Sequence, residues 1–318
     1  MKQMFALILA FIMILSLVAC GSVPNESGSL TFTTGGDTGT YYAFGIVMGD
    51  RVSDSTDTQV TVISSNGSQS NIEALLAGDA DIAFVQSDVM VYGYKGTRLF
   101  AETGAVTNFS VVAAMYMEQV QIVTLDPSIK SVADLAGKRV SIGAVGSGVY
   151  YNSMDILGAY GLTENDITPT FYDFSETIEA LRDGRIDAGF LVAGAPTNAV
   201  TSLAATKDTY LVSLDDEHIS ALIASSPYYA KNTIGSEVYG TLEDVTTVGI
   251  SAVVIASDSA SDDDVYNFIS AVFNNLDALE HVKAKEVNLD FAASVTDVPY
   301  HPGAARYFGE KGLTVPTK

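Results

Sequence analysis

The chain has 318 residues, of which 47% are hydrophobic, and a formal net charge of −22. This length and hydrophobic content allow one large core or, more typically, two, and they exclude a disordered chain. The acidic excess excludes nucleic acid as an expected partner, because a phosphate backbone carries charge of the same sign.

The first 20 residues have the pattern of an export signal. Residues 1–20 (MKQMFALILAFIMILSLVAC) hold one basic residue and a long apolar run, and they end in Leu-Val-Ala-Cys. This ending resembles the bacterial lipobox, in which the cysteine becomes the lipid-modified N-terminus. An uncleaved anchor is the alternative, but about 16 apolar positions are fewer than the ~20 that span a bilayer. We therefore expect Cys20 to carry lipid and the mature protein to be extracytoplasmic, anchored to a bacterial membrane.

Residues 21–29 are small, polar and unpatterned, which is typical of a flexible tether between a membrane and a folded body. Cys20 is the only cysteine of the chain. A disulfide, a cysteine-based metal site and thiol catalysis are therefore all excluded from the body.

The body begins with a predicted strand, helix, strand unit. Residues 30–34 and 59–64 are short β-rich runs, and apolar side chains recur at helical spacing in residues 41–52. A second helix is predicted at residues 71–77, with Ser68 as its N-cap, and a strand at residues 82–85 follows it.

Two pairs of segments show that one unit occurs twice. Residues 72–85 (IEALLAGDADIAFV) match residues 178–191 (IEALRDGRIDAGFL) in register, and residues 30–42 resemble residues 139–151 at nearly the same offset. The second pair shares a Gly-x-x-Gly-[Thr/Ser] loop followed by two tyrosines. The repeat predicts two similar α/β lobes with a cleft between them.

The two glycine loops predict the kind of ligand. Each loop should lead from a strand into a helix, whose N-terminus has unpaired N–H groups and the positive end of the helix dipole. Two such loops facing one cleft suit a small anion, and we expect a carboxylate. The alternative is that the glycines only allow the turn from strand to helix.

Five polar or glycine-rich segments follow predicted strands, and the carboxyl ends of strands are where open parallel sheets bind ligands. These segments are residues 38–41, 65–68, 86–88, 143–148 and 193–196. We therefore expect them to converge on one surface.

The long β-rich run at residues 109–125 is predicted to cross between the lobes. The return crossing falls between residues 212 and 256, where residues 211–214 and 245–255 are both credible strands. We assign residues 30–115 and 251–318 to lobe I and residues 116–250 to lobe II.

The C-terminal part contains no pattern of catalysis or metal binding. Residues 262–279 form a predicted amphipathic helix, and the aspartates at its start suit a helix N-terminus better than a calcium loop. The three histidines lack metal-ligand spacing, and no nucleophile has a partner in sequence. We expect no enzyme activity, no metal and no cofactor.

Several motifs in order resemble the TAXI family of solute-binding proteins, which serve TRAP transporters. The motifs are GTYY (residues 39–42), SNGSQSN (65–71), GDADIAFVQSD (78–88), GSG (146–148), DGRIDAGFLVAGAP (183–196) and YHPGAARYFGEKG (300–312). The resemblance runs from about residue 30 to the C-terminus.

The resemblance implies a type II periplasmic-binding-protein fold, in which two lobes, each with a mixed, mostly parallel sheet flanked by helices, close on a solute in the interlobe cleft. It also implies a carboxylate solute such as glutamate or 2-oxoglutarate, and a membrane permease driven by an ion gradient. Two alternatives stay open: a binding protein for an ATP-driven permease or a sensor kinase, and an exported enzyme.

Carried over to this sequence, the resemblance also implies a ligand shell. Its members would be Thr38, Gly39, Thr40, Tyr41, Ser65, Asn66, Ser68, Gln86, Ser147, Gly148 and Val149. Asn66 replaces a glycine of the commoner family loop, and asparagine tolerates positive φ. Tyr41 could line the pocket or pack in the core, and Gln86 could bind solute or cap a turn. Arg182 and Arg185 are expected to be exposed to solvent.

Overall fold

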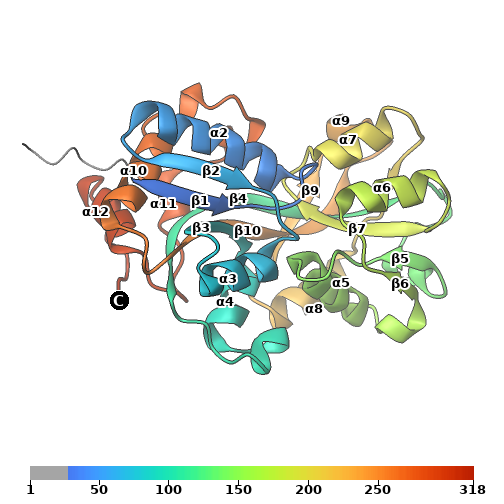
Figure 1. Cartoon of the computed structure of the whole chain (residues 1–318). Coiled ribbons are helices and arrows are strands. Elements are labelled where there is room, and N and C mark those ends of the chain that lie inside the picture. The colour runs from blue at the N-terminus through green and yellow to red at the C-terminus, as the bar shows by residue number, and fades with distance from the viewer. Residues whose placement is uncertain (1–27) are drawn as a thin grey trace, which may run out of the picture.

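The computed structural model describes residues 28–318 (Figure 1). The predicted signal at residues 1–20, with Cys20, and tether residues 21–27 lie outside the described residues. The first strand begins at Ser29, so the last residue of the predicted tether belongs to the folded body. No helix within residues 28–318 has the length and apolar character needed to cross a membrane.

All strands of the described chain join one mixed sheet. The order is β2-β1-β3-β10-β4-β7-β5-β6, with β8 paired to β4 and β9 paired to β10. The strands are β1 (Ser29–Thr33), β2 (Gln59–Ile63), β3 (Ile82–Gln86), β4 (Phe109–Thr124), β5 (Arg139–Ser141), β6 (Thr168–Thr170), β7 (Ala188–Ala193), β8 (Tyr210–Leu211), β9 (Ala230–Ile234) and β10 (Val245–Ser257). Parallel pairs build each end of the sheet, and the antiparallel pair of β4 and β10 joins the two ends.

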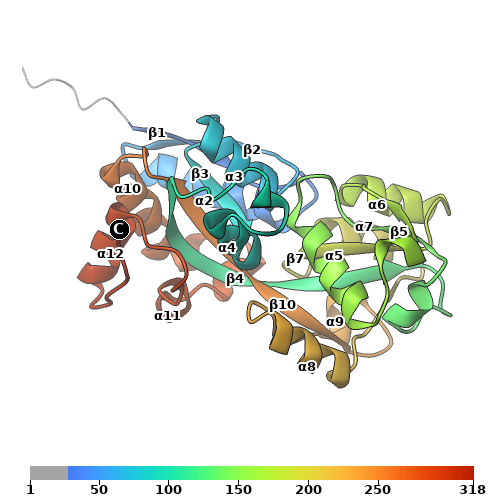
Figure 2. The same ribbon diagram turned by 90° about the horizontal axis from the view of Figure 1, so that it is seen from below.

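Helices surround both ends of the sheet (Figures 1 and 2). They are α2 (Thr40–Ser55), α3 (Ser68–Ala77), α4 (Ser87–Lys95), α5 (Gly148–Ala159), α6 (Phe174–Arg182), α7 (Asn198–Ala204), α8 (Asp216–Ser225), α9 (Ser236–Tyr239), α10 (Asp262–Phe273), α11 (Leu289–Ala292) and α12 (Pro302–Glu310). Helices α2, α10 and α12 lie with β1–β3 in lobe I, and α5–α8 lie around β5–β7 in lobe II.

The hydrophobic core is divided in the same way. One cluster of buried residues includes Phe32, Phe84 and Phe268 of lobe I. A second includes Val140 and Phe190 of lobe II. Because β4 and β10 contribute buried residues to both clusters, these two strands are the covalent and hydrogen-bonded link between the lobes.

The sequence repeat corresponds to a structural repeat. Helix α3 leads into β3 through Gly78, and α6 leads into β7 through Gly184. Both glycines adopt left-handed backbone, with φ of +79° and +68°, a conformation that costs any other residue steric energy. The same helix stop thus occurs in each lobe.

Two predicted helix boundaries are wrong. Helix α3 begins at Ser68 itself, and Gly67 with φ of +114° takes the N-cap position, so Ser68 is not the N-cap. Helix α10 ends at Phe273 rather than at residue 279, and a short 3-10 turn, Leu276–Ala278, follows it.

Of the two candidate strands for the return crossing between the lobes, β10 is the one that makes it, because β8 has only two residues.

Candidate functional site

A pocket lies between the lobes, beyond the carboxyl ends of several strands. Its lobe I wall comes from segments that follow β1 and β2 and from the end of β3. Its lobe II wall comes from the segment after β5, the end of β7 and the start of α6. Glu118 of the crossing strand β4 also lines it. All five predicted segments therefore contribute residues to this pocket, two of them through their first residue alone, Gln86 and Ala193.

Ten of the eleven residues of the predicted ligand shell line this pocket. They are Gly39, Thr40, Tyr41, Ser65, Asn66, Ser68, Gln86, Ser147, Gly148 and Val149. Thr38 is the exception, because its hydroxyl pairs with the hydroxyl of Ser175 at 3.1 Å, outside the lining. Asn66 needs no positive φ, since that conformation falls on Gly67 instead.

Three helix N-termini point into the pocket without a capping side chain. The N-cap residues of α2, α3 and α5 are Gly39, Gly67 and Ser147, and within the described chain none of them forms a side-chain cap. Several other helices have a side-chain cap, among them α6 with Asp173 and α10 with Ser261, whereas α4, α7 and α9 have none. The N–H groups and helix dipoles at this pocket are therefore available to an anion.

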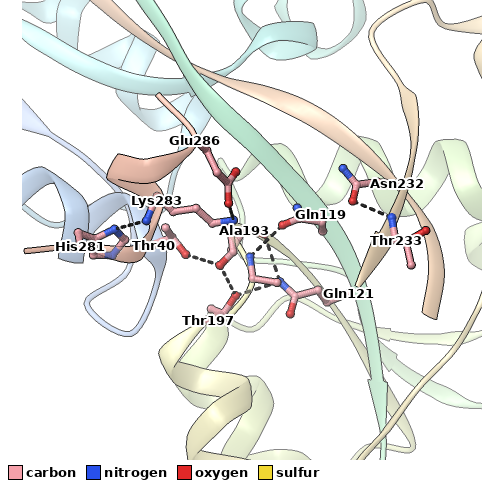
Figure 3. Close-up of polar contacts among 12 residues, drawn as sticks. Thr40, Gln119, Gln121, Ala193, Thr197, Asn232, Thr233, His281, Lys283 and Glu286 are labelled. Atoms are coloured by element: carbon pink, nitrogen blue, oxygen red, sulfur yellow. Dashed lines mark hydrogen bonds and ion pairs between the residues drawn. The ribbon is translucent and has the colours of Figure 1, made fainter. Parts of the chain in front are cut away.

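The two lobes touch each other around the pocket. The hydroxyl of Thr40 donates a 2.8 Å hydrogen bond to the carbonyl of Gly194, which also accepts from Thr197 at 3.1 Å (Figure 3). On the other side, the Ser70 N–H donates to the carbonyl of Gly146 at 3.0 Å. These contacts hold helices α2 and α3 of lobe I against lobe II, which is a closed arrangement.

One pocket residue, Glu118, was not predicted from the sequence. Its side chain is only 2% exposed, and its Oε2 accepts a 2.7 Å hydrogen bond from the hydroxyl of Tyr41. Burial raises the pKa of Glu118 to about 8, although the bond from Tyr41 and the charge of Lys283 oppose that rise. A signal was present, because Glu118 is the one charged residue in residues 109–124 of the sequence.

Tyr41 has both of the roles that the sequence left open. Its ring stacks on Phe84 of the core, with centroids 4.5 Å apart and an angle of 3° between the planes. It also lines the pocket and donates to Glu118. Burial raises the pKa of Tyr41 well above its usual value, so this hydroxyl stays protonated and remains a donor.

Two further polar atoms at the pocket have no partner in the described chain. They are Gln86 Oε1 and Ser147 Oγ, both buried. Gln86 precedes α4 but does not cap it with its side chain, which removes the capping role considered for it. Buried polar atoms without partners are rare, and these two are available to a molecule bound in the pocket.

The remaining predicted side chains do not enter the site. Arg182 and Arg185 are exposed at the end of α6, as expected. No Lys, Arg or His is among the described residues that line the pocket. Within residues 28–318, no group of three His, Cys, Asp or Glu side chains is arranged to hold a metal ion.

The profile of the NMT1-like family matches residues 32–312, nearly the whole described chain. The chain belongs to the NMT1-like family.

Solved structures show the same fold at low sequence identity. A periplasmic transporter superposes with a TM-score of 0.55 at 14% identity, over 91% of this chain and 93% of that one. A protein of Bordetella bronchiseptica RB50 gives 0.53 at 17% identity, over 84% and 77%. The periplasmic aliphatic sulphonate binding protein SsuA of Escherichia coli gives 0.46 at 13%, over 90% and 94%. The two superpositions with TM-scores above 0.5 confirm the predicted two-lobed α/β fold of this NMT1-like family member.

Proposed function

We propose that this NMT1-like protein is an extracytoplasmic solute-binding protein of the TAXI type, which captures a small carboxylate and delivers it to a TRAP permease. The observation that supports it most directly is the convergence of three uncapped helix N-termini, from both lobes, on one pocket. Glutamate and 2-oxoglutarate are the solutes that we expect from the resemblance to TAXI proteins.

The proposed mechanism is hinge closure. In an open form, water would solvate the N-termini of α2 and α3 on lobe I and of α5 on lobe II. A carboxylate between them is bound by both lobes only when they meet, so it stabilises the closed form by its differential affinity. The movement requires a change of twist in β4 and β10, near the proposed lobe boundaries at residues 115/116 and 250/251.

The proposed location follows from the N-terminal sequence. A lipid on Cys20 would hold the protein at the outer face of a bacterial membrane. Mass spectrometry of protein from membranes tests this point, with the expected result of a diacylglycerol-modified Cys20 as the first residue.

Thermal unfolding tests the binding function. Purified protein lacking residues 1–20 is heated with carboxylates, including glutamate and 2-oxoglutarate, and with their primary amides as uncharged controls. A ligand at 100 times its Kd adds about 2.7 kcal/mol to the free energy of unfolding. We expect at least one carboxylate, and no diamide, to raise the Tm. A complete panel without any shift contradicts the proposal.

Uptake by membrane vesicles tests the permease class. With this protein and its permease present, uptake should stop when the ion gradient is collapsed and continue when ATP is depleted. The opposite result would assign the protein to an ATP-driven permease.

A further inference from the structure

The carboxylate of Glu118 has no role in binding a ligand's carboxylate, yet it lies in the wall of the same pocket. It is buried and receives one hydrogen bond, from Tyr41. Within the described chain it takes part in no ion pair; the nearby buried ammonium of Lys283 pairs instead with Glu286 at 2.6 Å (Figure 3). A buried carboxylate without a counter-ion is costly unless a bound group supplies the charge.

A second acceptor, Gln86, lines the same pocket as Glu118, and both residues pair with β10, Gln86 with Ala252 and Glu118 with Ile250. Gln86 Oε1 is buried, lines the pocket and has no partner in the described chain. The acceptors also lie next to the helix N-termini: a methyl group placed on Gly148, at the start of α5, would lie 2.0 Å from Gln86 Oε1. Tyr41, which holds Glu118, is itself in the first turn of α2.

The pocket thus presents two adjoining surfaces of opposite character. One has N–H donors from helix N-termini, and the other has the acceptors Glu118 and Gln86. An α-amino acid has the complementary pattern, because its carboxylate and its ammonium group are attached to the same carbon atom. An ammonium group offers three donors, which suits a cluster of acceptors.

The charge of the whole protein favours the same ligand class. The net charge of −22 repels free anions at long range, and the ammonium group of an amino acid always removes one negative charge relative to its 2-oxo acid, so the amino acid of each pair is repelled less. A ligand with both groups also neutralises Glu118 at contact distance.

We propose that Glu118 makes the pocket selective for carboxylates that carry an ammonium group, that is amino acids, over amine-free analogues such as 2-oxo acids. This inference rests on the proposed function, since the helix N-termini must first bind the carboxylate. Glu118 acts as a specificity-determining residue: its carboxylate accepts a charge-assisted hydrogen bond from the ammonium group.

A proton should leave the protein when an amino acid binds. The titratable groups that face Glu118 are Tyr41 on α2, Tyr116 on β4, Asp88 on α4 and Lys283 on the 3-10 turn Val282–Lys285. In the free protein the pKa of Glu118 is about 8, so the group is mostly protonated at pH 7. An ammonium group favours the ionised form, so binding releases the proton and affinity rises with pH up to about 8.

An amine-free ligand has the opposite dependence. It can use Glu118 only as a protonated donor, so its affinity should fall as the pH passes the same value. Asp88 titrates nearby, and the variant Asp88→Asn therefore serves to remove its contribution to the pH profile.

Calorimetric titration tests the inference with matched ligand pairs. Each amino acid in a panel is paired with its 2-oxo acid, for example L-glutamate with 2-oxoglutarate and L-leucine with 4-methyl-2-oxopentanoate. We expect at least one amino acid to bind and its 2-oxo acid to bind more weakly by about tenfold to hundredfold, the strength of a charge-assisted hydrogen bond. Titration of the unchanged protein in two buffers of different ionisation enthalpy should show proton release.

The variant Glu118→Gln should lose most of the preference within the pair, and its proton release should disappear. Glu179→Gln is the matched control, because Glu179 is exposed on α6 and away from the pocket. Thermal unfolding without ligand shows whether each variant is folded. If Glu118→Gln does not fold, the proton release of the unchanged protein on binding an amino acid tests the role of Glu118.

The outcomes separate the two proposals. Equal or tighter binding of the 2-oxo acid overturns the role of Glu118 and leaves carboxylate capture standing. Binding of neither member of any pair overturns carboxylate capture, and the selectivity with it.

Discussion

Asn152 of α5 donates a 3.0 Å hydrogen bond to the buried carboxylate of Asp88 at the start of α4. The bond joins lobe II to lobe I outside the pocket lining, and Asn152 also donates to the hydroxyl of Tyr229 at 2.8 Å. Burial is the main cause that raises the pKa of Asp88 to about 7, with a smaller contribution from the charge of Asp155.

The first prediction concerns the pH dependence of folding. The folded protein holds the Asp88 proton more tightly than the unfolded chain does, so this stabilisation is complete below a pH of about 4 and is lost as the pH rises through about 7. The variant Asp88→Asn has no charge to bury. The free energy of unfolding of the variant minus that of the unchanged protein should therefore be about 2 kcal/mol larger at pH 8 than at pH 5.

Urea denaturation at both pH values measures this change. Glu118 titrates in the same range and the charge of Asp88 contributes to its raised pKa, so the comparison is repeated in the Glu118→Gln background, where Glu118 does not titrate. A constant difference between the two proteins from pH 5 to pH 8 would show that Asp88 does not titrate there.

The second prediction concerns Gly148, at the start of α5. A methyl group there would meet Gln86 Oε1 at 2.0 Å and Ser68 Oγ at 3.1 Å, both on lobe I. Gly148→Ala should therefore hinder closure and weaken solute binding by at least tenfold, a loss of about 1.4 kcal/mol. Calorimetry measures the affinity, and small-angle scattering measures whether solute still compacts the protein.

The same helix supplies the control. Gly158 has no atom within 4 Å of an added methyl group. Gly158→Ala should leave affinity unchanged and stabilise the helix slightly, by up to about 1 kcal/mol. If both variants bind alike, contact between α5 and Gln86 is not required for closure.

The third prediction concerns the bond from Thr40 to Gly194. Thr40→Val removes the donor, while the Gly194 carbonyl keeps its bond from Thr197. Because the bond crosses between lobes, its loss should weaken the closed form by about 1 kcal/mol, about fivefold in affinity. Thr201→Val, at an exposed position of α7, should change neither affinity nor Tm. Wild-type affinity in Thr40→Val would remove this bond from the closing mechanism.

The fourth prediction concerns the repeated helix stop. An alanine at Gly78 or Gly184 meets no atom within 4 Å, so only the left-handed backbone opposes it. Each substitution should lower the free energy of unfolding by about 1–2 kcal/mol, without changing affinity. Gly309→Ala, within helix α12 and also without neighbours, should not destabilise. Equal effects at all three positions would contradict the role of the backbone conformation.

Local signals explain what the sequence could predict. The matching segments at residues 72–85 and 178–191 predicted the positions of α3–β3 and α6–β7, because helix periodicity and a glycine at the end of a helix are local properties of the sequence. Ten residues of the ligand shell implied by the TAXI resemblance line the pocket, and the segments that hold them follow strand ends, which share one edge in a parallel sheet. Thr38 lies outside the lining because its hydroxyl points to Ser175, a contact between lobes that no local pattern encodes.

Long-range packing explains what was missed. Glu118 lies within the long strand β4, where the apolar run predicts burial; its charge marks the position as unusual but does not show that it faces a cavity. Its role depends on Tyr41, 77 residues away in the chain. The start of α3 was misplaced because Ser68 is a good N-cap residue by type, whereas its hydroxyl accepts a bond from the N–H of Gln86.

Lobe II is a single uninterrupted insertion, because every element from β5 to β9 lies in the chain between β4 and β10. Both described chain ends therefore belong to lobe I (Figure 1). Replacing that one insertion with its counterpart from a relative would produce a chimaera in which half of the ligand wall is foreign and both chain ends are native.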